Sequence, residues 1–90
     1  MYSKKTKVIN GSGIHARPAS DFAVLAKSFE ASVTIKNLDE MTAPVNAKSV
    51  VRLLAGGFDK ETNVEISANG SDERQAVDAL VALIERGFGE

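Results

Sequence analysis

Alternation of hydrophobic and polar residues predicts four strands. Residues 4–9, 32–37 and 62–68 each place apolar or small side chains on one face and polar side chains on the other, as half-buried strands do. A short strand over residues 42–45 contains Pro44, which has no N–H to donate and therefore favours the edge of a sheet. The side chains expected to face inward in the longer strands are Thr6, Val8, Val33, Ile35, Val64, Ile66 and Ala68.

Apolar residues at helical spacing predict three helices. Pro18 opens the first helix, since proline is tolerated in a first turn. The second covers Asn46–Ala55 and ends at Gly56-Gly57 in a left-handed cap, with Phe58 packing back under it. The third starts at Gly70-Ser71. The expected buried stripes are Ala19, Phe22, Ala23, Ala26 and Phe29 in the first helix and Ala76, Val77, Leu80, Leu83 and Ile84 in the last.

The predicted order of elements is βαββαβα. The connection between the second and third strands is too short for a parallel crossover, so these strands form an antiparallel hairpin. A sheet this short cannot be wrapped on both sides, and the three helices therefore share one face. We predict an α/β two-layer sandwich, with a four-stranded antiparallel sheet, three helices on one face and solvent on the other. With 90 residues, the chain forms a single domain over residues 1–90.

His15, the only histidine, lies between the first predicted strand and the first helix. A glycine-rich loop precedes it, and Pro18 follows it in the first helical turn. The amides of Ala16 and Arg17 are unpaired in such a turn, and the helix dipole adds positive potential there. We therefore expect the imidazole to lie beside free N–H groups.

This combination suits an anion of phosphate size. Backbone N–H groups at a helix start bind phosphate, and Arg17 adds charge-assisted hydrogen bonds. The same field is expected to keep His15 neutral and nucleophilic. These features favour a histidine that is itself phosphorylated. An N-cap histidine beside a surface arginine explains the same residues, and the motif alone does not separate the two interpretations.

Composition excludes several classes of protein. A net charge of −1, without a basic block, argues against a nucleic-acid partner. No apolar run approaches the roughly 18 residues of a membrane span and no signal-peptide pattern opens the chain, so we expect a cytoplasmic protein without membrane insertion. The absence of cysteine and the single histidine favour neither a metal site nor a cofactor.

Three stretches resemble the HPr family, the histidine phosphocarriers of the bacterial sugar phosphotransferase system. Gly13–Ala19 (GIHARPA) is similar to the family's active-site signature, and Val45–Val51 (VNAKSVV) to its regulatory-serine segment. Ile66–Glu73 (ISANGSDE) is similar to its last strand and the start of its last helix. The motifs occur in family order and the resemblance covers essentially the whole chain, which makes it far more specific than any one motif.

The resemblance implies a phosphoryl carrier that has no turnover of its own. His15 would accept a phosphoryl group on Nδ1 from enzyme I, the upstream phosphoenolpyruvate-dependent enzyme, and pass it to sugar-specific enzyme IIA domains. Arg17, Ala16 and Ser12 are assigned to the same site. We expect the carrier to be a monomer.

The resemblance also marks Ser49 as the target of a serine kinase/phosphorylase, whereas from the residues alone Ser49 is an ordinary N-cap. The short helix that follows cannot bury all its apolar residues on one side, so we expect an exposed docking patch. Lys27 and Arg52 add a positive rim or are ordinary solvated residues. The residues assigned to partner docking are Ala19, Ser20, Lys27, Val50, Val51, Arg52 and Leu54.

Two features depart from the family pattern. The hairpin between the second and third strands is about three residues longer than usual. Glu61 stands where many relatives have a turn glycine, so we expect a different turn type there. Two alternative functions remain open: a regulatory binding module that acts mainly through Ser49, and a carrier that serves nitrogen regulation or dihydroxyacetone phosphorylation.

Overall fold

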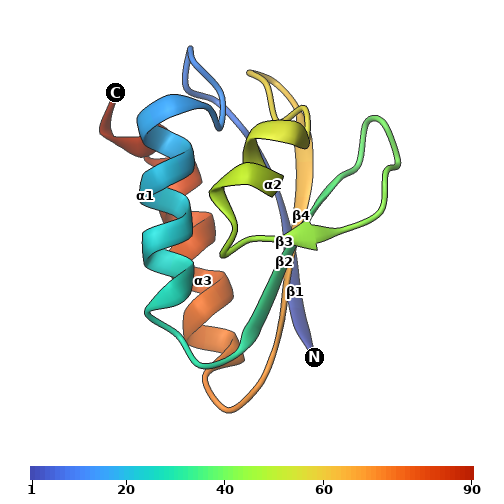
Figure 1. Cartoon of the computed structure of the whole chain (residues 1–90), viewed down its shortest axis with the longest axis vertical. Helices are drawn as coiled ribbons and strands as arrows, with labels where there is room; N and C mark the ends of the chain where they lie inside the picture. The colour runs from blue at the N-terminus through green and yellow to red at the C-terminus, as the bar shows by residue number, and fades with distance from the viewer.

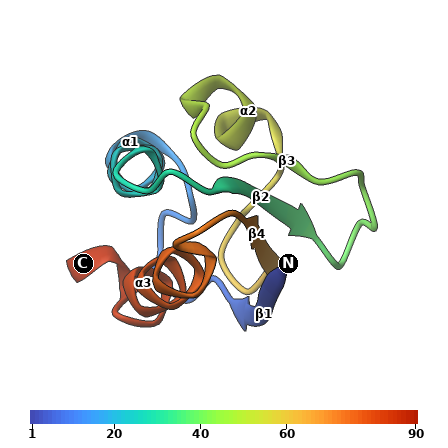
Figure 2. The same ribbon diagram turned by 90° about the horizontal axis from the view of Figure 1, so that it is seen from below.

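The sheet of this protein has the strand order β1-β4-β2-β3, and every neighbouring pair is antiparallel. The computed structural model describes all residues from 1 to 90. Three helices cover one face of the sheet, as predicted, and the opposite face is open (Figures 1 and 2). The elements in chain order are β1 Tyr2–Lys7, α1 Ala16–Lys27, β2 Ser32–Asn37, β3 Val45–Asn46, α2 Val50–Ala55, β4 Asn63–Asn69, α3 Glu73–Glu85 and the 3-10 turn η1 Gly87–Gly89.

The inward-facing residues of the two central strands form the floor of the core. β4 pairs with β1 on one side and β2 on the other, so that Ile35 lies opposite Ile66 and Val33 opposite Ala68. These four side chains and Val64 are at most 2% exposed. The alternation read from the sequence is therefore confirmed in β2 and β4.

The helices contribute the other half of the core. Ala19, Phe22, Ala23 and Ala26 of α1 are all buried, as predicted. Phe29, assigned to the same stripe, lies beyond the end of α1 at Lys27 and is only half-buried. In α3 the assignment of Leu83 to the buried stripe is wrong. Leu83 is only half-buried, and the buried residue is Val81. Val81 lies four residues after Val77, so it shares the face that packs on the sheet, whereas Leu83 falls at its margin.

The first strand runs over residues 2–7 rather than 4–9, because β1 pairs along its whole length with β4. Val8 still continues the pairing beyond the strand. Its N–H donates to the carbonyl of Thr62, and its carbonyl accepts from the N–H of Glu61. Val8 is fully buried, which confirms its predicted orientation.

The second helix begins at Val50, and the predicted start at Asn46 is wrong. Asn46 pairs with Thr34 in β3, and its side chain accepts a hydrogen bond from the N–H of Lys48. Ser49 then caps α2 through its hydroxyl, which accepts from the N–H of Arg52 at 3.2 Å. The helix is thus limited to six residues.

The edge strand β3 consists of Val45–Asn46 alone, so the predicted strand over residues 42–45 is misplaced, although its position at the sheet edge is confirmed. Pro44 lies just outside it. The hairpin before β3 is held by Asn37, a buried residue whose side-chain oxygen accepts from the N–H groups of Asp39 and Glu40. A long connection here is therefore compatible with an intact sheet.

The prediction of a different turn type at Glu61 is wrong. Glu61 has φ +74°, a left-handed conformation that glycine adopts without strain. Two hydrogen bonds hold this conformation: the N–H of Glu61 donates to the carbonyl of Val8 and the N–H of Thr62 donates to the carbonyl of Asp59. The fold thus imposes a conformation that the residue disfavours.

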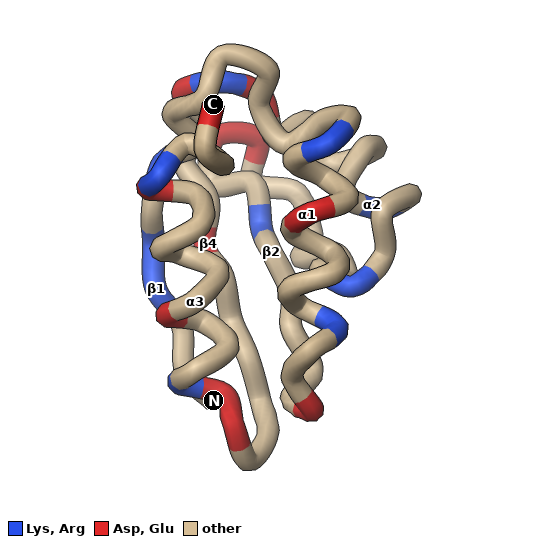
Figure 3. Tube along the Cα trace, turned by 90° about the vertical axis from the view of Figure 1, so that its left-hand side faces the viewer, with Lys and Arg blue, Asp and Glu red and all other residues tan.

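Lysines, arginines, aspartates and glutamates are interspersed along α1 and α3 (Figure 3). This distribution agrees with the net charge of −1. None of the helices is long and apolar enough to cross a bilayer.

Candidate functional site

The loop that carries His15, the turn between α2 and β4, and the C-terminus lie at the same end of the molecule (Figure 1). His15 is the N-cap of α1, with φ −132° and ψ 164°, and its side chain makes no capping hydrogen bond. The side chain is 36% exposed. The imidazole is therefore at the surface and open to another protein.

The first turn of α1 presents its amides beside this ring. Ala16 and Arg17 are the first two residues of the helix, so their N–H groups have no acceptor within it. Ala16 has φ +50°, a strained value for a residue other than glycine. Arg17 is exposed and takes part in no ion pair within the chain. Its guanidinium is available for an anion.

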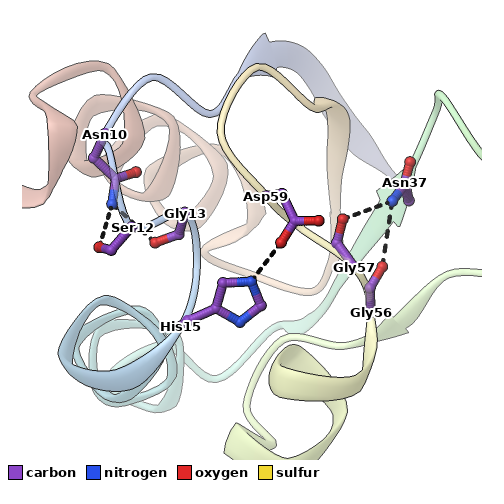
Figure 4. A network of polar contacts seen from close by, with 8 residues as sticks. All are labelled: Asn10, Ser12, Gly13, His15, Asn37, Gly56, Gly57 and Asp59. Atoms are coloured by element: carbon purple, nitrogen blue, oxygen red, sulfur yellow. Dashed lines mark hydrogen bonds and ion pairs between the residues drawn. The ribbon is translucent and has the colours of Figure 1, made fainter.

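The ring has one partner that the sequence did not reveal. Nε2 of His15 lies 2.6 Å from Oδ1 of Asp59 (Figure 4). The two residues are 44 positions apart, and no local pattern around Asp59 distinguishes it from an ordinary turn residue. Only the folded chain therefore places a carboxylate beside the imidazole.

The backbone brings these two residues together. The N–H of Ile14 donates to the carbonyl of Phe58 at 2.8 Å. Gly13 permits this close approach, since a Cβ there would lie 2.7 Å from the carbonyl oxygen of Phe58 and 2.9 Å from Cα of Asp59. Gly13 also has φ +70°. The two loops are therefore joined at adjacent positions, just before His15 and Asp59.

Ser12 points to a different partner. Its hydroxyl contacts the Glu90 carboxylate at 2.9 and 3.0 Å, and the side-chain amide of Asn10 donates to the same carboxylate at 3.1 Å. These donors, Asn10 first, lower the pKa of the Glu90 carboxyl. The Asn10 amide also donates to the carbonyl of Gly13 at 2.8 Å. This network ties the C-terminus to the His15 loop, and the structure shows no bond from Ser12 to His15.

The predicted docking residues differ in how exposed their side chains are. Val51 is 75% exposed and Leu54 46% exposed, while Leu53 on the same helix is buried, so the expected apolar patch on α2 is present. Ser20, Lys27 and Arg52 are exposed, and Val50 is half-buried. The assignment of Ala19 is wrong, since Ala19 is fully buried in the face of α1 that packs into the core.

A family model described as the PTS HPr component phosphorylation site matches residues 2–86. The chain belongs to the HPr family. It is 40% identical over 84 residues to the phosphocarrier protein HPr of Haemophilus influenzae, an alignment that covers 93% of this chain and 95% of that protein. It is also 36% identical over 87 residues to the phosphocarrier protein NPr of Proteus mirabilis, covering 97% and 94% of the two chains.

The structural comparison agrees with this assignment to the HPr family. The crystal structure of HPr-C-His from Thermoanaerobacter tengcongensis superposes with a TM-score of 0.93 at 37% identity, covering 100% of this chain and 98% of that one. HPr-like sequence also occurs within longer proteins: the chain matches a multiphosphoryl transfer protein of H. influenzae at 40% identity over 81 residues but spans only 16% of its length. Membership in the HPr family makes this chain a phosphocarrier of the phosphotransferase system, and its fold is that of the HPr structures.

Proposed function

We propose that this protein carries a phosphoryl group on Nδ1 of His15, receiving it from enzyme I and passing it to enzyme IIA domains in the cytoplasm. The observation that carries the proposal is the position of the ring. His15 is surface-exposed at the N-terminus of α1, where two amides have no acceptor within the helix. The HPr-family signature surrounds the same residue.

The surroundings of His15 fit a phosphoryl group that must be accepted from a donor and then transferred to an acceptor. The amides at the helix terminus and the unpaired Arg17 guanidinium can donate hydrogen bonds to a phosphoryl group in the transition state of transfer. In that state the negative charge is spread over the three equatorial oxygens of the group. Donors aimed at that charge stabilise the transfer state more than the resting phosphohistidine. We assign Arg17 and the amide of Ala16 this role. Ser12 contributes indirectly, through the contact that anchors the loop to Glu90.

Replacing His15 with alanine is expected to abolish phosphorylation by enzyme I. The purified chain is incubated with phosphoenolpyruvate and enzyme I from an HPr-containing bacterium, and intact mass is measured before and after brief acid treatment. The wild-type chain should gain one phosphoryl group that acid removes, because phosphohistidine is acid-labile. Ser49→Ala is the matched control and should label like the wild type. An acid-labile gain in His15→Ala would contradict the assignment, and a wild-type chain that never gains mass would contradict the carrier function.

Ser49 is proposed as a regulatory site in the same protein. Its hydroxyl lies at the N-terminus of α2, two residues before Val51, the first residue of the exposed patch. A phosphate there places a dianion beside Val51 and Leu54, an apolar surface from which a docking partner must exclude water. Phosphorylation is therefore expected to weaken docking.

An ATP-dependent serine kinase that acts on another HPr is expected to produce an acid-stable label on this chain and to slow its subsequent phosphorylation by enzyme I. The rate is measured on the fully serine-phosphorylated protein. Ser49→Ala should remain unlabelled and transfer at its original rate under identical treatment. Absence of label on the wild-type chain, with the kinase active on its own substrate, would remove the regulatory role.

The similarity to NPr supports a second candidate, a carrier of the nitrogen-related branch. The acceptor distinguishes the two. Phosphorylated protein is offered separately to a sugar-specific enzyme IIA and to the corresponding nitrogen-related acceptor, and the faster transfer identifies the branch.

A further inference from the structure

We propose that Asp59 is a positioning residue for phosphoryl transfer: it accepts the Nε2–H of His15 and thereby keeps Nδ1 unprotonated as the attacking nitrogen. This inference rests on the proposed phosphocarrier function and adds a residue to it. The observation is the 2.6 Å contact between Nε2 of His15 and Oδ1 of Asp59. An ionised carboxylate is an acceptor only, so the ring nitrogen that faces it must carry the hydrogen. The other ring nitrogen then holds the lone pair.

The contact is built into the backbone. Ile14 and Phe58 are both buried, and the N–H of one donates to the carbonyl of the other at 2.8 Å. His15 and Asp59 are the next residues along the two segments. The turn that holds Asp59 is closed by its own hydrogen bonds, from the N–H of Asp59 to Gly57 and from the N–H of Thr62 to Asp59.

The Asp59 side chain has no competing partner. Its carboxylate makes no ion pair with any lysine or arginine and hydrogen-bonds only to His15. Neighbouring Glu61 faces elsewhere, with its carboxylate 3.9 Å from Nζ of Lys7. Within this turn, therefore, one carboxylate is directed at the imidazole and the other away from it.

The proposed step balances without moving a proton. Nδ1 attacks the phosphorus of the donor's phosphohistidine, the donor's N–P bond breaks, and its electron pair returns to the donor's ring nitrogen. A new N–P bond forms at Nδ1, and the His15 ring becomes a cation that still carries hydrogen on Nε2. The Asp59 carboxylate stabilises that cation, and when the phosphoryl group leaves for the next acceptor the ring is neutral again in its original tautomer.

An exposed ion pair by itself contributes little to stability, and Asp59 is 73% exposed. The test therefore measures the state of the ring rather than the stability of the fold. Two variants separate hydrogen bonding from charge. Asp59→Asn keeps an oxygen that accepts from Nε2–H but removes the negative charge, whereas Asp59→Ala removes both. Glu61→Gln is the matched control, since it makes the same change in net charge within the same turn.

The first readout is the tautomer of His15, from multiple-bond proton–nitrogen NMR correlations of the labelled protein at a pH where the ring is neutral. In the wild type, Nε2 should have the shift of a protonated nitrogen and Nδ1 that of an unprotonated one. In Asp59→Ala both shifts should move toward their average, with Asp59→Asn between the two and Glu61→Gln like the wild type. Identical ring shifts in Asp59→Ala and the wild type would overturn the proposal.

The second readout is the rate of phosphoryl uptake from phosphorylated enzyme I. Loss of one solvent-exposed hydrogen bond predicts a rate about 5- to 10-fold lower in Asp59→Ala, with partial recovery in Asp59→Asn. Unfolding midpoints should be the same in all four proteins. Equal rates in Asp59→Ala and the wild type would overturn the proposal while leaving the carrier function intact. A wild-type chain that takes up no phosphoryl group would instead overturn the carrier function, and the ring shifts would still report on Asp59.

Discussion

Replacing Phe58 with alanine is expected to lower the free energy of unfolding by about 3–5 kcal/mol. The side chain is 1% exposed and belongs to the core shared by the sheet and the helices. It packs directly beneath the end of α2, since a Cβ placed on Gly56 would lie 2.1 Å from its ring. Truncation removes this contact and leaves a cavity under the short helix. A domain of this size has a total stability of about 5–15 kcal/mol, so the loss is a large fraction of it.

Urea unfolding followed by far-ultraviolet circular dichroism measures this effect. Val51→Ala is the matched control, because Val51 lies on the same helix but is 75% exposed and has little packing to lose. Its unfolding midpoint should stay close to that of the wild type. If Phe58→Ala and Val51→Ala unfolded at the same urea concentration, the packing role assigned to Phe58 would be wrong.

Replacing Gly13 with alanine is expected to cost about 3 kcal/mol of stability and to separate the His15 loop from the Asp59 turn. Two effects combine at this position. The backbone has φ +70°, which an L-residue adopts only with strain. The new Cβ would also lie 2.7 Å from the carbonyl oxygen of Phe58, the oxygen that accepts from the N–H of Ile14. Backbone atoms on both sides must then move.

The same loop contains the control for this substitution. A Cβ on Gly11 would meet no atom within 4 Å, so Gly11→Ala is expected to leave the unfolding midpoint nearly unchanged. Hydrogen exchange gives a local readout, because the N–H of Ile14 should lose protection in Gly13→Ala and keep it in Gly11→Ala. Equal protection of Ile14 in the two variants would show that Gly13 is not required for the contact between the loops.

Features with a local cause were predicted well. Strand β2 has the predicted bounds because Val33 and Ile35 alternate cleanly with polar neighbours. The buried stripe of α1 follows from helical spacing alone. The left-handed glycine after α2 is Gly57, with φ +71°, as the Gly56-Gly57 pair predicted. Each of these features depends on residues that lie within a single strand, helix or turn.

The errors occurred where a distant segment overrode a local preference. Asn46 was assigned to a helix but pairs with Thr34, since a strand at the sheet edge was available to it. Glu61 keeps a glycine-like backbone because Val8, on another segment, accepts its N–H. Leu83 was part of the predicted stripe and Val81 was not, but the packing of α3 on the sheet buries Val81 and leaves Leu83 half-buried.

The sequence by itself determined the class of fold and the place of His15 at the start of a helix, and it singled out that residue as the proposed phosphoryl acceptor. It did so because hydrophobic periodicity, glycine, proline and a single imidazole act over a few neighbouring positions. Only the tertiary structure decided that Asp59 reaches Nε2 of His15 and that Glu90 is joined to Ser12. The first contact joins residues 44 positions apart and the second joins residues 78 positions apart. Both form only when the sheet has brought these segments together, and the His15–Asp59 contact also needs the close approach of the Phe58–Asp59 backbone that Gly13 permits.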